Sequence, residues 1–305
     1  MWQAPPAPVS REWLPVLDMP APGAQNRWTV LLRALLAIPQ LVVVWVLSVV
    51  AFFVTVIGWF GALVLGRLPG FVADYLTVYV PYETRVTAYL MLTVDRYPPF
   101  RFHAPEYPVQ VGLRPGELNR LAVLFRIILV IPASIVQGLL EAGWWMVAFI
   151  SWLVVLVLGR MPQPLYEATA AIMRYRMRYA AYLVMLSSAY PKRLFGEEPG
   201  SEPDGPVSAT RPLVLSGAGR GLLVVFILLG VVSWTTSSIT ASVDSDDNDD
   251  DVTNPTQHVI APLVPGPVQT RPAGSAGVAG VAGLAGSGRG PAEGRTSAAY
   301  RSSLV

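Results

Sequence analysis

The stretch RWTVLLRALLAIPQLVVVWVLSVVAFFVTVIGWFGALVLGRLP (27–69) decides the fold of this chain, because it returns as RLAVLFRIILVIPASIVQGLLEAGWWMVAFISWLVVLVLGRMP (120–162). Residues 26–98 align with residues 119–191 at a constant offset of 93, without a gap and with 26 of 73 positions identical. The informative identities are polar, Gly, Pro or aromatic: Asn26/Asn119, Arg33/Arg126, Pro39/Pro132, Trp59/Trp152, Gly66/Gly159, Arg85/Arg178 and Tyr89/Tyr182. They mark a duplicated unit.

Composition and three long apolar tracts predict an integral membrane protein. Of the 305 residues, 53% are hydrophobic and only 14% are charged, which is unusual for a soluble globular protein. Residues 34–66 carry no charge, residues 127–159 carry only Glu141, and a third tract at 221–243 is uncharged. Because about 20 apolar residues span a bilayer, each tract is long enough to cross it. The predicted fold class is an all-α integral membrane protein.

We expect each of the first two tracts to form a transmembrane hairpin rather than one long helix. A single helix would be about 50 Å long, whereas the hydrocarbon core is about 30 Å thick. Hairpins also place the basic segments 1–33, 67–126 and 160–220 on one side, as the positive-inside rule favours. They move Glu141 from the bilayer centre to an outer turn beside Gly143. Five spans follow, with a cytoplasmic N-terminus and an extracytoplasmic C-terminus; three spans are the alternative.

Each tract is followed by a second helical pattern. Tyr75, Tyr79 and Tyr82 recur at helical spacing, which predicts an amphipathic helix that lies in the membrane interface or packs across its own hairpin. Pro81 is expected to kink or split the first of these helices. The predicted segments are a disordered Pro-rich N-terminus (1–25), membrane repeat 1 (26–100), a connector (101–118), membrane repeat 2 (119–191), a cytoplasmic linker (192–219), a C-terminal transmembrane helix (220–243) and a disordered acidic, then Gly/Ala/Pro-rich tail (244–305).

Arginines shared by the two repeats are candidate anion-binding residues, because a planar guanidinium can bind a phosphate through two N–H groups. Arg33 and Arg126 lie about one turn inside the apolar boundary. They either extend to the headgroups or face a lipid phosphate or an anionic substrate. Arg67 and Arg160 belong to a Gly-Arg-x-Pro sequence, in which Gly ends a helix, Arg anchors it at the interface and Pro prevents its continuation.

The densest basic cluster lies in repeat 2. Arg174, Arg176 and Arg178 stand among tyrosines, a pattern typical of general membrane anchoring or of binding to anionic lipid headgroups. The predicted partners are therefore the bilayer, anionic headgroups and a membrane protein that the sequence does not identify. Nucleic acid is not expected, because the net charge is only +2 and the surrounding sequence is apolar.

No catalytic, metal or cofactor site is predicted. The chain has no Cys, and its two His residues, His103 and His258, lack the spacing of metal ligands. The acidic run at 244–251 lacks the Gly and the terminal Glu of a calcium-binding loop. Since no nucleophile elbow, phosphate-binding loop or His/carboxylate cluster is present either, we expect the protein not to be an enzyme.

The doubled pattern of RWTVLLRALLAIPQ, IGWFGALVLGRLPG and YETRVTAYLMLTVDRYPPF resembles a bacterial, mainly actinobacterial, membrane family, the domain of unknown function 4389. The resemblance covers residues 26–191 and departs in the second copy, where AYP replaces DRYPPF and Glu141-Ala142-Gly143 interrupts the apolar tract. It implies a multi-pass protein of the bacterial cytoplasmic membrane and adds no catalytic residues.

Three functions remain open from the sequence, and an enzyme that acts on lipid is the least favoured of them. The first is a non-enzymatic scaffold or accessory protein that contacts anionic lipid or a membrane partner. The alternative is a transporter of small molecules or ions, because internal repeats recur in transporter folds. Transmembrane hairpins would make the two repeats parallel. Single crossings would oppose them, place Glu141 in the protein interior and favour transport.

Overall fold

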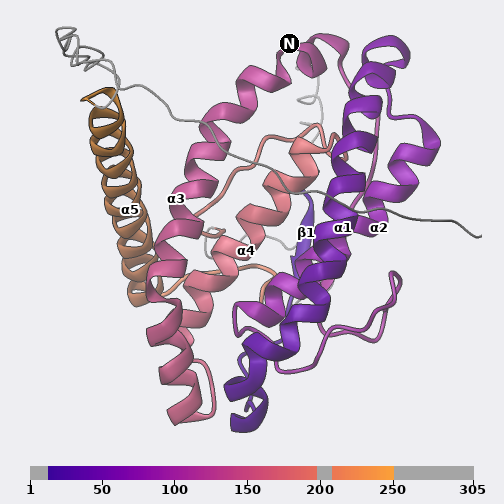
Figure 1. The fold of residues 1–305 in the computed structure, drawn as a ribbon. Coiled ribbons are helices and arrows are strands. Elements are labelled where there is room, and N and C mark those ends of the chain that lie inside the picture. Colours follow the sequence, from indigo (N-terminus) through magenta and orange to yellow (C-terminus); the bar gives the residue numbers. More distant parts are fainter. Residues whose placement is uncertain (1–12, 198–207, 251–305) are drawn as a thin grey trace, which may run out of the picture. The chain divides into compact units, whose positions relative to one another are not determined.

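A computed structural model describes residues 13–197 and 208–250 of the chain (Figure 1). Its elements are β1 (Val16–Asp18), α1 (Arg27–Leu65), α2 (Gly70–Leu90), β2 (Gln110–Gly112), α3 (Arg120–Leu158), α4 (Gln163–Leu183) and α5 (Gly217–Asp250). Helices α1 and α3, and residues Gly217–Thr236 of α5, are long and apolar enough to cross a membrane. The predicted disorder at 1–12 and 251–305, and linker residues 198–207, lie outside the described residues.

The predicted transmembrane hairpins are wrong, because α1 and α3 are each one continuous helix of 39 residues. Glu141, which suggested an outer turn, stays helical and forms an ion pair with Arg176 on α4. Gly143 serves close packing instead of a turn, since a Cβ there would overlap the backbone of Phe226 on α5. Pro81 likewise lies inside the continuous helix α2 and does not split it.

The chain reverses at the Gly-Arg-x-Pro sequences, as their composition predicts. Gly66 and Gly159 end α1 and α3 in the left-handed conformation, at φ 71° and 67°, which costs a glycine little. Helix α2 then packs back along α1, where the Tyr75 hydroxyl donates to the carbonyl of Leu47 at 2.8 Å. Helix α4 packs along α3 in the same way. Each repeat is thus a helical hairpin of one long apolar arm and one shorter, more polar arm.

The two hairpins are opposed, and a pseudo-twofold axis relates them. The Trp59 indole on α1 donates to the carbonyl of Val123 near the start of α3, at 3.1 Å. Its counterpart Trp152 near the end of α3 donates to the carbonyl of Val30 near the start of α1, at 2.7 Å. Both pairs differ by the same 93-residue offset. The duplicated sequence therefore makes one contact twice, at the two ends of an antiparallel helix pair.

Backbone hydrogen bonds close both ends of this pair. The Leu118 N–H donates to the Gly66 carbonyl at 2.9 Å, and the Gln25 N–H donates to the Gly159 carbonyl at 2.7 Å. Between these ends α1 and α3 separate, and α4 is visible in the gap (Figure 1). The two long helices are thus joined at both ends and lie apart between them.

The elements form layers. Helix α1 buries only a narrow stripe of residues, whereas fourteen of the 21 residues of α4 are buried. Strands β1 and β2 pair antiparallel and contact α4 and α2 respectively; among the described residues neither strand contacts α1 or α3. The predicted disorder of the segment before α1 is thus wrong for residues 13–25, which pair with the connector and pack on α4. The layers therefore follow in this order: the apolar long arms α1 and α3, the more buried short arms α2 and α4, and an irregular layer that contains β1 and β2.

Helix α5 packs against α3 through small residues. A Cβ at Gly143 would overlap the Phe226 backbone, and one at Gly230 would overlap the Leu139 backbone. Small residues let membrane helices approach this closely. Helix α5 continues to Asp250, so residues 244–250, predicted to be disordered, are helical.

The start of α5 is bound to Glu167 on α4. The buried Glu167 carboxylate accepts from the Ser216 N–H at 2.8 Å, from its hydroxyl at 2.6 Å and from the Gln163 amide at 3.1 Å. Burial alone would raise the pKa of Glu167, but these hydrogen bonds outweigh it and the pKa is lowered from its ordinary value.

We expect Gly143→Ala to separate α5 from α3, because the added methyl must displace backbone rather than a side chain. The free energy of unfolding in detergent should fall by about 1–3 kcal/mol, the usual cost of overpacking. Gly138→Ala is the control, since a Cβ at Gly138 meets no atom within 4 Å. Equal unfolding temperatures for the two variants would contradict the close α3–α5 contact.

We also expect acid to loosen α5. Because the pKa of Glu167 is lower in the folded protein, its stabilising contribution is complete at neutral pH and is lost as pH falls below about 4. Glu167→Gln should remove this part of the pH dependence between pH 7 and 3, measured as the unfolding temperature. Glu106→Gln, at an exposed position, should retain the wild-type profile; a Glu167→Gln profile identical to wild type would exclude the interpretation.

Candidate functional site

A cavity of about 820 Å³ lies between the two repeats and is lined by α1, α2, α3, α4 and residues just after α4. We call it the inter-repeat cavity. Its long walls are the second half of α1 and the first half of α3, where the bowed pair separates. Its size is in the range of small-molecule sites.

The mouth of the cavity is apolar. Phe52 and Phe60 on α1 and Ile127 on α3 line it and are 63%, 60% and 60% exposed. These side chains belong to the apolar surface of the long arms. A molecule dissolved in the apolar phase of a membrane would therefore reach the cavity without crossing a polar barrier.

Three charged groups that contact one another also line the cavity and form what we call the floor cluster: Glu83, Arg176 and Glu141. Arg176 donates to the Glu83 carboxylate at 2.6 Å and also contacts the Glu141 carboxylate. Glu83 and Arg176 are equivalent positions of the two repeats, so their ion pair lies at the pseudo-twofold axis. The two copies thus carry opposite charges at a position where a residue meets its own counterpart.

Buried polar atoms without a protein partner also face the cavity. Gln137 is 6% exposed, and neither its amide nitrogen nor its amide oxygen has a hydrogen-bond partner. The Thr55 hydroxyl and the Arg126 Nε are likewise buried and unpartnered, and both residues line the cavity. Because an unsatisfied buried polar group costs about 1–3 kcal/mol, these atoms indicate where a polar ligand group or water would bind.

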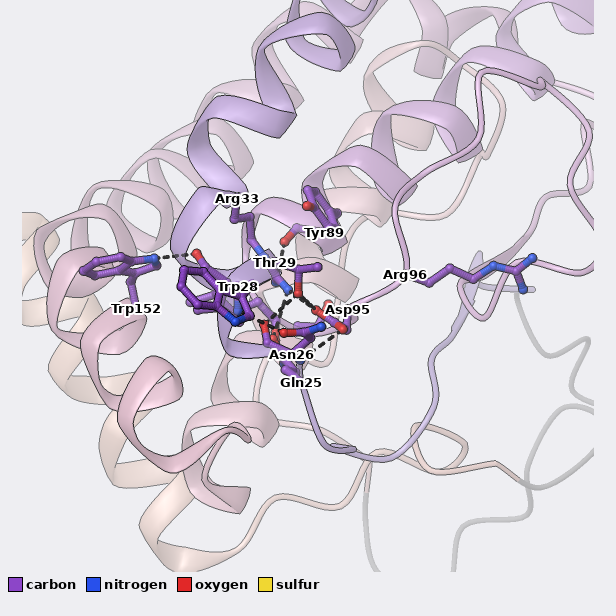
Figure 2. Close-up of polar contacts among 12 residues, drawn as sticks. Gln25, Asn26, Trp28, Thr29, Arg33, Tyr89, Asp95, Arg96 and Trp152 are labelled. Carbon is purple, nitrogen blue, oxygen red and sulfur yellow. Dashed lines mark hydrogen bonds and ion pairs between the residues drawn. The ribbon is translucent and has the colours of Figure 1, made fainter.

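The predicted anion-binding residue Arg33 is a buried structural clamp and is only 3% exposed. Its guanidinium donates to the carbonyl of Tyr89 at 2.9 Å, to the Gln25 amide oxygen at 3.0 Å and to Asp95 at 3.0 Å (Figure 2). It also stacks over the Tyr89 ring at 4.6 Å. Arg33 therefore joins the start of α1 to the end of α2, and it does not extend outward toward headgroups.

Asp95 organises the same cluster. Besides Arg33 it accepts from the Thr29 hydroxyl at 2.6 Å and from the Asn26 N–H at 3.2 Å (Figure 2). Asn26 is the N-cap of α1, where its side chain accepts from the Trp28 N–H. The DRYPPF ending of repeat 1 thus supplies the carboxylate that stabilises the first turn of α1.

Arg126 makes the equivalent clamp in repeat 2 with one difference. It donates to the carbonyls of Tyr182 at 2.8 Å and Ser187 at 3.0 Å and stacks over the Tyr182 ring at 4.2 Å. The counterpart of Asp95 is Ser188, and among the described residues no carboxylate pairs with Arg126. Arg126, unlike Arg33, is therefore a buried cation whose direct partners are backbone carbonyls, and it lines the same cavity as the floor cluster, which has one excess negative charge.

The other predicted arginines separate into two groups. Arg174 and Arg178 are buried and pair with Glu197 at 3.0 and 3.7 Å. Burial, with the charge of Arg174 beside it, lowers the pKa of Arg178 to about 9, so the group stays cationic at neutral pH. Arg67 and Arg160 are exposed at the two hairpin turns. Only Arg126 and Arg176 line the inter-repeat cavity.

The sequence contained signals for two site residues that the prediction missed. Gln137 interrupts an apolar run and replaces a Val of repeat 1, and Glu83 stands opposite an Arg in the alignment. A charge reversal between equivalent positions is the pattern expected where a twofold axis brings them together. With parallel repeats, no twofold axis would bring equivalent positions together, so the charge reversal alone did not indicate a contact.

Comparison with known proteins identifies the repeated unit. The model of a family described as a domain of unknown function, number 4389, matches residues 27–101 and 120–194. No curated protein and no solved structure matches the chain. The chain carries two tandem copies of this domain, each comprising one long arm, one short arm and the segment that follows them. Among the described residues, no group of three or more His, Asp or Glu is placed to hold a metal ion.

We expect Asp95→Asn to lower the free energy of unfolding by about 1.5–3 kcal/mol, the usual contribution of hydrogen bonds to charged groups, because Arg33 would stay buried without its counter-charge. Chemical or thermal unfolding in detergent measures the change. Asp74→Asn is the matched control, since Asp74 is exposed on α2 and should change stability by less than about 0.5 kcal/mol. Similar effects of both substitutions would refute the assigned role of Asp95.

Proposed function

We propose that this protein with two copies of domain of unknown function 4389 is a non-enzymatic membrane protein that binds a membrane-borne amphiphile in the inter-repeat cavity. The observation that carries the proposal is the combination of an apolar mouth with a floor of charged and unpartnered polar groups. Such a gradient fits a molecule with hydrocarbon chains and one compact polar group.

The polar groups of the floor indicate what that compact group is. Arg176 and the carboxylates Glu83 and Glu141 neutralise one another apart from one negative charge, which Arg126 balances. Apart from the Arg126 Nε, the unpartnered atoms are neutral donors and acceptors on Gln137 and Thr55. We therefore favour a neutral headgroup with hydroxyl and ester or amide groups, such as a diacylglycerol, over an anionic one. Binding of anionic headgroups, or of a membrane-protein partner, at exposed Arg67 and Arg160 stays a prediction.

The proposal can be tested with two fluorescent lipids, a labelled diacylglycerol and an equally labelled phosphatidic acid, titrated onto the protein in detergent. Gln137→Leu removes the unpartnered amide at similar volume and should weaken diacylglycerol binding about tenfold, the effect of about 1.4 kcal/mol. Ala51→Trp, which introduces the residue that repeat 2 carries at the equivalent Trp144, should block the cavity.

Val46→Trp is the matched control, because Val46 is exposed on α1 and does not line the cavity. It should bind like wild type. Failure of both lipids to bind, or equal affinity of wild type and Ala51→Trp, would refute the proposal. Stronger binding of phosphatidic acid, lost in Arg126→Gln, would instead support the anionic-lipid prediction.

Transport remains a second candidate, supported by one observation. The repeats are opposed, and a charge pair lies on their pseudo-twofold axis, an arrangement that recurs in transporters with inverted repeats. Reconstituted vesicles should then move the labelled lipid between leaflets, and Glu83→Gln should slow the movement. Transport of this kind requires α1 and α3 to cross the membrane.

A further inference from the structure

We propose that α1 and α3 lie along one leaflet, with their axes in the membrane plane, and that the surface of the long arms is the face on which the bilayer rests. The partner is thus a lipid surface, and it covers the helices lengthwise. This inference concerns the placement of the fold and does not depend on the inter-repeat cavity being occupied.

The apolar surface is far longer than a bilayer is thick. Large apolar side chains are exposed from Trp28 to Leu65 on α1 and from Leu121 to Leu158 on α3. At 1.5 Å per residue each helix is about 58 Å long, about twice the hydrocarbon core of about 30 Å. Because the two helices meet at both ends, they overlap along this whole length.

In repeat 2, the irregular segment after α4 lies alongside a part of α3 that would be inside the hydrocarbon if α3 crossed the bilayer. Arg178 holds the carbonyl of Lys192, and Arg174 holds the carbonyl of Arg193. The Tyr175 hydroxyl beside them reaches the carbonyl of Ala133, which is 13 residues, or about 20 Å, into α3. Lys192 and Arg193 are both exposed. If α3 crossed the bilayer centrally and without tilt, its hydrocarbon-embedded part would begin about 14 Å from its end. Ala133 would then lie about 6 Å inside the hydrocarbon, and the exposed Lys192 and Arg193 would lie near this level.

Repeat 1 gives the same result independently. Arg85 donates to the carbonyl of Phe102 at 2.5 Å, and nearby the Tyr82 hydroxyl bonds to Gln40 at 2.5 Å. Gln40 is likewise 13 residues, or about 20 Å, into α1. The neighbouring Arg101 is exposed on a non-helical segment. Lipid-exposed irregular chain does not occur in the hydrocarbon region, because its backbone groups would have no partners.

One arrangement keeps the irregular chain and the exposed charges of both repeats out of the hydrocarbon. With α1 and α3 in the plane, the apolar long arms enter one leaflet, and the irregular layer behind α2 and α4 stays in water. Amphipathic elements of this kind immerse their apolar face by about 5–10 Å. The mouth of the inter-repeat cavity then opens toward the acyl chains, since Phe52 and Phe60 belong to the immersed surface.

The hairpin turns provide a sharp test, because Arg67 and Arg160 are equivalent, exposed and at opposite ends of the helix pair. The chain has no Cys, so Arg67→Cys and Arg160→Cys each introduce a single thiol. A membrane-impermeant maleimide is applied to spheroplasts, to inverted vesicles and to detergent-solubilised membranes. In-plane helices predict that both thiols react from the same side, with at least a tenfold preference over the other.

Labelling of the two turns from opposite sides would overturn the inference and establish that the helices cross. No labelling of either turn even in detergent would also overturn it, because the exposed turns on which it rests would be absent. Lys192→Cys is the internal control, since in-plane helices expose this position on the side of the turns, whereas crossing helices bury it in lipid. Unfolding temperatures equal to wild type show that the variants are folded. Loss of lipid binding in the cavity variants would leave this result unchanged.

Discussion

The fold depends on the antiparallel contact between two copies of one long helix. Trp59 and Trp152 each donate to a backbone carbonyl near the start of the other copy, and the hydrogen bonds at Gly66 and Gly159 close the ends. A contact made twice about a twofold axis constrains both ends equally, so the helices separate between them. The space between the repeats, the meeting of Glu83 with Arg176 and the burial of the short arms all follow from this contact.

Divergence between the copies gives the site its chemistry. Identical residues build the frame, as the clamps at Arg33 and Arg126 illustrate. The polar groups of the cavity stand where the copies differ, because Gln137 replaces Val44 and Glu141 replaces Ser48. Duplication supplied a pseudo-symmetric scaffold, and differences between the copies contribute polar groups from both, since Thr55 and Glu83 of repeat 1 also line the cavity. The loss of a carboxylate opposite Arg126 belongs to the same process, since it leaves a buried cation beside the cavity.

The sequence predicted the repeats, the helical class and the helix ends at Gly66 and Gly159. It failed where a residue type has two physical explanations. Gly143 fits a turn or a close helix contact, and only α5 decides between them. Glu141 fits an outer turn or an ion pair between helices, and Arg176, 35 residues later, supplies the pair. The strand before α1 was missed because its partner lies in the connector, far along the chain.

The charge argument that favoured transmembrane hairpins is compatible with a different arrangement of the two long helices. It required the basic segments to share one side of the membrane, and bending each apolar tract was one way to achieve this. Placing two continuous helices along the leaflet is another. It needs no turn in an uninterrupted Val and Leu run, and it leaves no irregular backbone in lipid. Hydropathy measures how much of a segment is apolar, not the direction in which it enters the bilayer. The exposed charges beside mid-helix Gln40 and Ala133 supply that direction.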